Sequence, residues 1–563
     1  MIADLPPGLI LILGALAVPI IPTWARRYYM LALPSLGLLH LLTLPDGLQG
    51  QVEMFGHTLT FLRIDGLATA FGIIFLMATF IFMIYGWHEI EVLQHISALI
   101  YAGAAVGAVF VGDLITLFIF WELTAIASVF LIWARRTERA YWAGLRYLVF
   151  QIGSGVILLA GLALHYRATG SIAFVHLGLV SLGTTLIFIA FGIKCAFPML
   201  HNWLQDAYPE ATVFGTVVLS AFTTKLAIYA LARGYAGTEM LIWIGALMTV
   251  FPIFYAIIEN DLRRVLAYNL NTQLGFMVVG IGIGTELAIN GAVAHAFTGI
   301  LYQALLFMSM GAVLYKVGTV KASELGGLHK SMPITAGFCI VGAASISAFP
   351  LFAGFVSKTI ILTAVAVEGH WLVWLVLLFA SASVLHYSGI KIPFFAFFAH
   401  DSGKRCEEAP RSMLIAMGIT AAICVGIGVW PSGLYQILPF PVDFVPYTTA
   451  HVITQLQLLM FSALAFSVLM RTGLYPPQLR STNLDSDWFY RRLGPAILRS
   501  LRDTVSQIYL SALLRTHIRL QRFVATVYRH HGPQGALART WPTGSTVLWV
   551  AVLLCVTLFL YYV

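Results

Sequence analysis

Apolar runs long enough to cross a lipid bilayer recur through nearly the whole length of this sequence. About twenty predominantly apolar residues suffice to span the hydrocarbon core as an α-helix. Hydrophobic residues make up 60% of the 563-residue chain and charged residues only 10%, against about 25% charged residues in soluble domains. The runs are continuous rather than alternating, which argues against a membrane β-barrel. The pattern predicts an all-α, polytopic membrane protein.

These runs predict about sixteen membrane crossings. Segment 334–367 is too long for one straight span and contains Pro350, while segment 181–204 contains Pro198. Proline leaves backbone groups that neighbours or water must satisfy, so we expect both segments to be broken helices. The full set of segments is 8–22, 28–45, 66–87, 93–111, 113–133, 144–166, 181–204, 211–232, 240–259, 266–284, 288–315, 334–367, 370–398, 412–431, 446–470 and 541–562.

Basic residues are distributed unevenly between the loops. Loops after even-numbered segments, through the fourteenth, hold only Arg63, Arg167 and Arg233. Cytoplasmic loops are enriched in Lys and Arg, so this bias predicts a multi-pass protein of the cell membrane with its N-terminus outside. It also accounts for the net charge of +8 without a nucleic-acid partner. The residues in and beside loops after odd-numbered segments are Arg26, Arg27, Arg135, Arg136, Arg139, Arg146, Arg263, Arg264, Lys316, Lys321, Lys330, Lys404, Arg405 and Arg411.

Ionisable side chains lie deep inside five of the predicted spans: Glu122, Lys194, Lys225, Lys358 and Lys391. A charge at the bilayer centre costs about 2.5–3.5 kcal/mol on insertion scales. Such groups face a protein interior and by default indicate an ion or proton path. Glu122, balanced between burial and a nearby ammonium, would be suited to proton exchange near neutral pH. The alternative is a set of structural ion pairs that lock neighbouring helices together.

Two of these lysines lie close to the proline breaks. Lys194 precedes Pro198 by four residues, and Lys358 follows Pro350. A broken helix exposes backbone dipoles near the membrane midplane, an arrangement that transport sites use. His201, one turn past the first break, is a candidate relay; a packed hydrogen-bonding histidine is the alternative.

The layout of the segments predicts the domain organisation. Two broken helices, one in each half, fit inverted structural repeats of five helices each. Arginines among the apolar residues of the tail suit an amphipathic surface helix, with a short helix plus a disordered link as the alternative. The cysteines show no metal-ligand spacing, so we expect no disulfide, metal or cofactor. The expected parts are N-terminal membrane helices at 1–92, the repeats at 93–232 and 240–398, further core helices at 412–470, an amphipathic cytoplasmic-surface helix at 484–530 and a final membrane anchor at 541–563.

An ordered set of motifs covers about residues 60–400. It comprises Trp121-Glu122; Lys194 with Phe197-Pro198, His201, Trp203-Leu204 and Asp206-Ala207; Lys225 with Tyr229; Asp261–Tyr268 with Gln273-Leu-Gly275; Ala304–Phe307; and Gly354–Lys358. In this order the motifs resemble the antiporter-like subunits of respiratory complex I and of Mrp-type multisubunit cation/proton antiporters, most of all the D-type subunits of the Mrp antiporters. The resemblance implies a fourteen-helix core with two inverted five-helix repeats, a C-terminal extension and a central polar axis. It also implies that Glu122 pairs with Lys194, that Lys225 relays protons and that Lys358 serves the second half.

The sequence departs from this family within one segment. The family commonly carries a histidine and a lysine one turn apart just before Ala-Leu-Leu-Phe, and these positions are Gly299 and Gln303 here. His295, one turn earlier, is retained. Gln303 cannot carry a proton as lysine can, although it can hold a water, so we expect a path that is interrupted or water-bridged. Lys391, with His386 about one turn before it, is a candidate to compensate.

The resemblance implies a proton-translocating membrane subunit of a multisubunit Na⁺/H⁺ antiporter with no catalytic chemistry of its own. Its expected partners are other membrane subunits, protons, Na⁺ and membrane lipid, and its expected location is a bacterial inner membrane. Two alternatives stay open. The same fold could serve a complex I-like oxidoreductase, a hydrogenase or an inorganic-carbon uptake complex. A scaffold subunit that does not conduct is the other, and Gly299 and Gln303 motivate it.

Overall fold

The computed structural model describes residues 5–54, 56–479, 483 and 485–563. The chain divides into two units, Met1–Asn483 and Leu484–Val563. Twelve helical stretches in the described ranges are long and apolar enough to cross a membrane, counting 213–235 as one stretch, and four shorter apolar helices accompany them. Each of the predicted spanning segments overlaps at least one helix. The expected polytopic, helical fold is confirmed.

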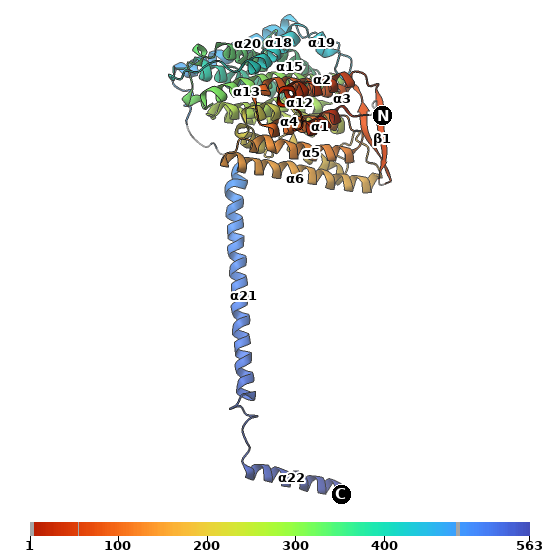
Figure 1. Cartoon of the computed structure of the whole chain (residues 1–563), viewed down its shortest axis with the longest axis vertical. Helices are drawn as coiled ribbons and strands as arrows, with labels where there is room; N and C mark the ends of the chain where they lie inside the picture. Colours follow the sequence, from red (N-terminus) through yellow and green to blue (C-terminus); the bar gives the residue numbers. More distant parts are fainter. Residues whose placement is uncertain (1–4, 55, 480–482, 484) are drawn as a thin grey trace. The chain divides into compact units, whose positions relative to one another are not determined.

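The first unit opens with helices that flank a β-hairpin. Figure 1 shows the helices lying side by side, with β1 at one end of them. Asp65 and Asp113 begin α3 and α5, because their carboxylates accept hydrogen bonds from backbone N–H groups of the first turn, the usual role of an N-cap aspartate. The elements are α1 (Pro7–Ala17), α2 (Thr23–Leu41), β1 (Gly47–Met54), β2 (His57–Ile64), α3 (Gly66–Tyr85), α4 (Val92–Val109), α5 (Leu114–Trp133) and α6 (Glu138–Thr169).

Three helices of the first unit are broken within the described ranges. The breaks at Pro198 and Pro350 are the two that the sequence predicts. The remaining one, around residues 220–222, contains no proline and was not expected. The breaks separate α7 (Leu182–Lys194) from α8 (Asn202–Ala207), α9 (Val213–Leu219) from α10 (Thr223–Tyr235), and α14 (Pro333–Ile346) from α15 (Ala353–Val367).

The two proline breaks share their sequence and their backbone shape. Both read Ala-Phe-Pro followed by an apolar residue, at 196–199 and 348–351. The alanines are left-handed, with φ of 60° and 57°, and the apolar residues Met199 and Leu351 follow at 69° and 73°. In each break the alanine N–H bonds the carbonyl three residues earlier and the phenylalanine N–H bonds the carbonyl five residues earlier, which is a Schellman motif. The same motif therefore ends a helix in both halves of the chain.

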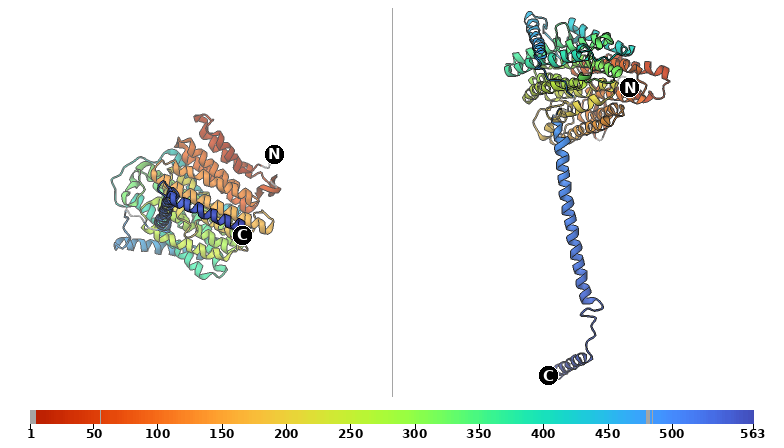
Figure 2. Two further views of the ribbon diagram at one scale, coloured as in Figure 1. Left: turned by 90° about the horizontal axis from the view of Figure 1, so that it is seen from below. Right: turned by 90° about the vertical axis from the view of Figure 1, so that its left-hand side faces the viewer.

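The other long helices of the first unit complete a bundle around α13. Figure 2 shows these helices running roughly parallel, and α13 packs against α3, α12, α14, α15 and α18. The elements are α11 (Glu239–Ile258), α12 (Leu262–Ile283), α13 (Glu286–Val317), α16 (Trp371–Val384), the π-helical turns η5 (Leu385–Ile390) and η6 (Phe394–Phe398), α17 (Lys391–Pro393), α18 (Arg411–Val429), α19 (Ser432–Tyr435) and α20 (Thr449–Arg471).

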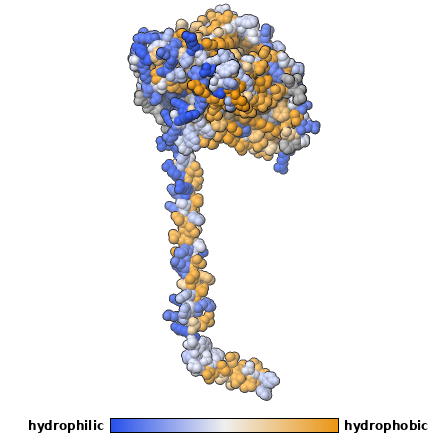
Figure 3. All heavy atoms as spheres, viewed as in Figure 1, coloured by the Kyte–Doolittle hydropathy of each residue, from blue (hydrophilic) through white to orange (hydrophobic). Residues whose placement is uncertain are grey.

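The surface of the first unit has the character of a lipid-facing protein. Figure 3 shows an apolar area on this face of the unit, with polar patches toward its sides. On α5 and α6, apolar side chains such as Ile119, Val149 and Val156 are about half exposed or more. Buried polar side chains are concentrated inside the bundle instead, where neighbouring helices can satisfy them.

The second unit consists chiefly of two helices. No residue of the 38-residue α21 is buried, and Figure 3 shows polar and apolar sides along it. Helix α21 falls within the stretch 484–530 and one residue beyond, where the sequence predicts an amphipathic helix; its place on a membrane surface stays a prediction. The last helix is long and apolar enough to span a membrane, and its role as a final anchor stays a prediction. The elements are η7 (Phe489–Leu493), α21 (Gly494–His531) and α22 (Thr543–Tyr562).

Candidate functional site

Lys194, the last residue of α7, is buried against α5 at the first helix break. Its ammonium donates hydrogen bonds to the Trp121 carbonyl oxygen at 2.5 Å and to Thr124 Oγ1 at 2.9 Å. It also lies 4.3 Å from the centroid of the Trp121 ring, close enough for attraction between the cation and the π-face. The direct partners of Lys194 on α5 are therefore neutral groups.

The Glu122 carboxylate leaves α5 toward α6 at a point where α6 carries Gly155. A Cβ added to Gly155 would overlap Glu122 Oε1, so the missing side chain makes room for the carboxylate. Within the described ranges, Oε1 has no hydrogen-bond partner. Glu122 and Lys194 interact electrostatically, but no ion pair shorter than 4.0 Å joins them among the described residues. The two charges that the resemblance pairs are therefore neighbours without direct contact.

Lys225 lies just after the unexpected break between α9 and α10. Its ammonium donates hydrogen bonds to the Ser220 carbonyl at 2.8 Å and to Gln303 Oε1 of α13 at 3.0 Å. The Tyr101 hydroxyl oxygen accepts a hydrogen bond from the Thr223 N–H at 2.9 Å. Side chains thus satisfy backbone groups that the break would otherwise leave unpaired, which explains how a helix can be interrupted here without proline.

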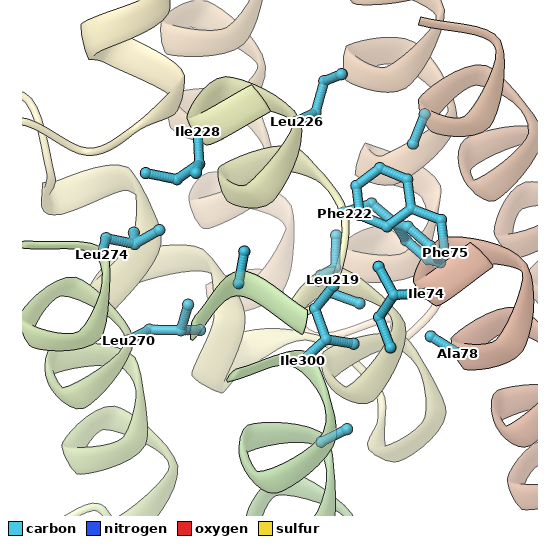
Figure 4. Packing of buried hydrophobic residues seen from close by; sticks show 14 of the residues in the cluster. Ile74, Phe75, Ala78, Leu219, Phe222, Leu226, Ile228, Leu270, Leu274 and Ile300 are labelled. Atoms are coloured by element: carbon cyan, nitrogen blue, oxygen red, sulfur yellow. The ribbon is translucent and has the colours of Figure 1, made fainter. Parts of the chain in front are cut away.

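Apolar packing fixes the position of this break. Figure 4 shows Leu219 and Phe222, which flank it, close to Ile74, Phe75 and Ile300. The ring centroids of Phe222 and Phe75 are 5.3 Å apart in an edge-on arrangement, a favourable geometry for two aromatic rings. The carbonyl that binds Lys225 is therefore held in place by well-packed neighbours on α3 and α13.

His295 is the centre of a buried hydrogen-bonded network on α13. Its Nδ1 lies 2.9 Å from Ser357 Oγ of α15, and its Nε2 lies 3.1 Å from Gln273 Oε1 of α12. The Tyr302 hydroxyl lies 3.3 Å from the same Nε2. A neutral imidazole donates from one nitrogen and accepts at the other. His295 therefore bridges α12 and α15 as a neutral imidazole, with one nitrogen donating and the other accepting.

The network continues from α12 to η5. Gln273 Nε2 donates to Asn269 Oδ1 at 2.9 Å, and Asn269 Nδ2 donates to Ser388 Oγ at 2.7 Å. Sequence reasoning did not single out Asn269, Ser388 or Ser357 as functional residues. The available signal was the pair of amides on α12, four residues apart and so on one face of a spanning helix.

Lys358 lies next to this network, one residue after Ser357 on α15. Its ammonium donates a hydrogen bond to the carbonyl of Ile346 at 2.8 Å. Ile346 is the last residue of α14, immediately before the break. The ammonium also lies 5.2 Å from the centroid of the Phe276 ring. Lys358 thus binds a helix end that the break exposes, as Lys225 does in the first half.

Gly299 separates two groups of polar side chains on α13. Residues 295, 299 and 303 recur every four positions and share one helix face. His295 joins the α12 network while Gln303 binds Lys225, and no hydrogen bond between described residues joins the two groups. Gln303 Nε2 has no partner within the described part of the chain. The two groups are therefore separated by a gap in direct hydrogen bonding at Gly299, and a path that is interrupted or water-bridged there stays a prediction.

Lys391 is held at the end of another helix. Its ammonium donates hydrogen bonds to the carbonyls of Ala256, Ile257 and Glu259 at 3.0, 2.7 and 2.7 Å. These carbonyls lie at the C-terminal end of α11, where a cation is favourable. This geometry matches a helix cap, and the relay role considered for Lys391 stays a prediction.

The two remaining candidate histidines pack against aromatic rings. The His386 ring lies 5.2 Å from the Phe466 ring and 5.5 Å from the Tyr475 ring, between centroids. The His201 ring lies 4.5 Å from that of Phe251. These contacts are the ones expected of packed histidines, and they place neither residue in the His295 network.

The chemistry available at these sites is protonation. Ammonium, carboxylate and imidazole groups can each gain or lose a proton, and the amides and hydroxyls between them can orient one. The described residues contain no group of three or more His, Cys, Asp or Glu side chains that could hold a metal ion, and the five cysteines are free.

Comparison with known proteins places the chain in a family. Residues 111–386 match the family described as NADH:quinone oxidoreductase/Mrp antiporter, TM. The N-type subunit of NADH-quinone oxidoreductase from Desulforudis audaxviator (strain MP104C) is 31% identical over 360 residues, which cover 58% of this chain and 70% of that protein. The chain belongs to this family. Membership in the NADH:quinone oxidoreductase/Mrp antiporter family confirms the resemblance seen in the sequence, and together with the apolar helices it identifies a multi-pass membrane protein.

The chain is also similar to an antiporter subunit and to a chain of an archaeal respiratory complex. The D-type subunit of the Na(+)/H(+) antiporter from Bacillus subtilis (strain 168) is 27% identical over 324 residues, covering 54% of this chain and 64% of that protein. The chain thus spans somewhat less than two thirds of that relative's length. A chain in the structure of the membrane-bound sulfane sulfur reductase (MBS), an archaeal respiratory membrane complex, matches with a TM-score of 0.72 and 21% identity, over 98% of this chain and 99% of that one. This last likeness shows a shared fold.

Proposed function

We propose that this chain is the proton-translocating membrane subunit of a multisubunit Na⁺/H⁺ antiporter. Protons move among Glu122, Lys194, Lys225 and Lys358 through intervening water. The observation that carries the proposal is that all three of these lysines are buried at or beside helix breaks, with ammonium groups bound to neutral oxygens. Family membership, and the antiporter subunit among its relatives, supports this reading.

The absence of contacting carboxylates suits a mobile proton. A lysine in a buried salt bridge is held charged by its partner, whereas one bound to carbonyl, hydroxyl or amide oxygens is not. Its proton occupancy then responds to the charge of its neighbours, so a proton arriving at one site favours release at the next. Glu122 Oε1 and Gln303 Nε2, which lack partners among the described residues, are suited to bind the water that links the sites.

The loops and the family support an orientation and a set of partners. Lys and Arg concentrate in the loops after odd-numbered segments, which favours a cytoplasmic position for those loops and an N-terminus outside. The location is the inner membrane of a bacterium. The chain works with other membrane subunits, and Na⁺ is the exchanged cation.

Antiport assays on the whole assembly test the proposal. Glu122→Gln and Lys194→Met remove the ionisable groups while keeping similar volume, and each should lower Na⁺/H⁺ exchange at least about tenfold. Lys321→Gln is the control, because the side chain of Lys321 is about half exposed and pairs with nearby Glu324 at 3.6 Å. Normal exchange in an assembled complex carrying either path variant would contradict the mechanism.

A proton path of the same kind in another complex is the second candidate. The 31% identity to a quinone oxidoreductase subunit favours coupling to a redox partner, and the identity of the co-purifying subunits decides between the two. The gap in hydrogen bonding at Gly299 also favours a further alternative, in which the subunit is a scaffold that does not conduct protons. Loss of transport in Lys358→Ala would reject the scaffold, because a scaffold has no transport to lose.

A further inference from the structure

Polar side chains continue along α10 beyond Lys225. Tyr229 and Arg233 follow at four-residue spacing and so share the lysine's helix face. Arg233 Nη1 and Nη2 donate to the two carboxylate oxygens of Asp65 at 2.9 and 2.8 Å. The side chain of Arg233 is 6% exposed and that of Asp65 is 32% exposed. A column of polar groups thus leads from the fully buried Lys225 to a carboxylate within reach of water at the far end of α10.

The hydrogen bonds in this column run in a direction that does not carry a proton. Arg233 Nε donates to the Tyr229 hydroxyl oxygen at 2.7 Å, and the Tyr229 hydroxyl donates to the Val109 carbonyl at 2.5 Å. A proton relay needs groups that can accept and then donate, whereas guanidinium is a donor only and keeps its proton in proteins. The tyrosine hydrogen is committed to a backbone carbonyl. These hydrogen bonds therefore give Lys225 no chain of alternating donors and acceptors toward Asp65.

Charge and packing close the same column. The guanidinium carbon of Arg233 lies 5.0 Å from the centroid of the Tyr229 ring. That ring packs edge-on against Phe71 and Phe174, with centroids 5.5 and 6.4 Å away. Arg233 lies between Asp65 and Lys225 along the column, so the positive end of its ion pair with Asp65 faces the lysine and opposes a second cation there. An arginine in a membrane pore can exclude protons in this way.

We propose that Arg233, pinned by Asp65, is an electrostatic plug that closes the Asp65 end of α10 to protons. A proton at Lys225 then has its open direction toward Gln303 and α13 rather than along α10 to the aqueous surface. The inference rests on the proposed function, because it assigns Arg233 the task of preventing a leak from that path. A purely structural role, anchoring the start of α3 to α10, is the competing account.

A measurement of passive proton flux distinguishes the proposed plug from a purely structural role of Arg233. The intact complex is reconstituted in liposomes with an internal pH dye, and proton entry is driven by a valinomycin-induced potassium potential without Na⁺. Arg233→Gln should raise proton flux about tenfold, and adding Lys225→Ala to this variant should remove the rise. Arg233→Lys keeps a positive charge at the site and should leave the flux near the wild-type level.

A neighbouring arginine supplies the matched control. Arg63 also binds Asp65, at 3.1 Å, and donates to the Phe174 carbonyl at 2.9 Å, but it does not lie on the Lys225 face of α10. Arg63→Gln should therefore not leak. A leak in Arg63→Gln equal to that in Arg233→Gln, or wild-type flux in an assembled Arg233→Gln complex, would overturn the plug.

A double variant keeps the test decisive if Arg233→Gln fails to assemble. Asp65→Asn with Arg233→Gln removes both charges, so no unpaired charge is left buried. A leak in the assembled double variant supports the plug, and its absence rejects it. The flux is measured without Na⁺, so this test does not depend on Na⁺/H⁺ exchange. If the complex shows no antiport but Arg233→Gln still leaks protons, the plug is supported and only the antiporter function is rejected.

Discussion

Lys225 donates a 3.0 Å hydrogen bond to Gln303 Oε1, and this contact joins the broken helix of the first half to the central helix α13. The resemblance seen in the sequence implies a lysine at the position of Gln303. In this chain the glutamine oxygen is instead a neutral acceptor for the Lys225 ammonium. The contact between α10 and α13 is therefore a hydrogen bond in which Lys225 can ionise and Gln303 cannot.

Replacing Gln303 with leucine removes this acceptor. Lys225 then keeps only the Ser220 carbonyl, and we expect exchange by the assembled complex to fall about tenfold, with a loss of stability of about 1–3 kcal/mol. Exchange assays and thermal unfolding of the complex measure the two effects. Ser309→Ala is the control on the same helix, since Ser309 Oγ bonds the carbonyl one turn earlier, that of Leu305. Equal exchange in Gln303→Leu and Ser309→Ala would show that the contact is dispensable.

Lys391→Met tests whether the lysine at the end of α11 is a cap or a relay. The variant leaves three carbonyls without their ammonium partner, so we expect thermal stability to fall by about 1–3 kcal/mol. Exchange per assembled complex should stay at the wild-type level. A variant that is stable but inactive would instead support the relay role.

The proline breaks illustrate what the sequence could predict. Pro198 and Pro350 remove donors, and that local chemistry is readable without a structure. The break before Lys225 was not predictable, because its backbone groups are satisfied by Tyr101 of α4 and by Lys225 itself. The Tyr101 contact is tertiary, and such a contact leaves no signal in one segment's hydropathy.

The candidate site was also predictable only in part. The place of the ionisable residues in apolar runs predicted that they are buried, but it did not predict their hydrogen-bond partners. Glu122 and Lys194 were expected to pair. The two groups interact electrostatically, while the direct hydrogen bonds of Lys194 go to neutral groups of α5. Asn269 escaped notice because an uncharged amide barely alters segment hydropathy, although it extends the His295 network to η5.

The Asp65–Arg233 pair predicts a pH dependence of stability. Burial alone would raise the pKa of Asp65, but hydrogen bonding and charge from Arg233 outweigh it and lower the pKa below its usual value. A carboxyl with a lowered folded-state pKa stabilises the fold fully above its unfolded pKa of about 3.9 and loses that contribution as pH falls through the folded value. The thermal midpoint of the wild-type complex should therefore exceed that of Asp65→Asn at pH 6, and the difference should shrink below about pH 4. A difference that is constant from pH 6 to pH 3 would show that ionisation of Asp65 is not the source.

Gly155→Ala tests the space that α6 leaves for Glu122. The added methyl would occupy the position of Glu122 Oε1, so the carboxylate must turn away from its place near Lys194. We expect exchange to fall about tenfold in the assembled complex, because the charge interaction between Glu122 and Lys194 weakens steeply with distance. Gly153→Ala, two residues away on the same helix, is a matched control because a Cβ there meets nothing within 4 Å. It should gain up to about 1 kcal/mol of helix stability and keep its exchange rate. Equal exchange in the two alanine variants would show that the position of the Glu122 carboxylate does not limit transport.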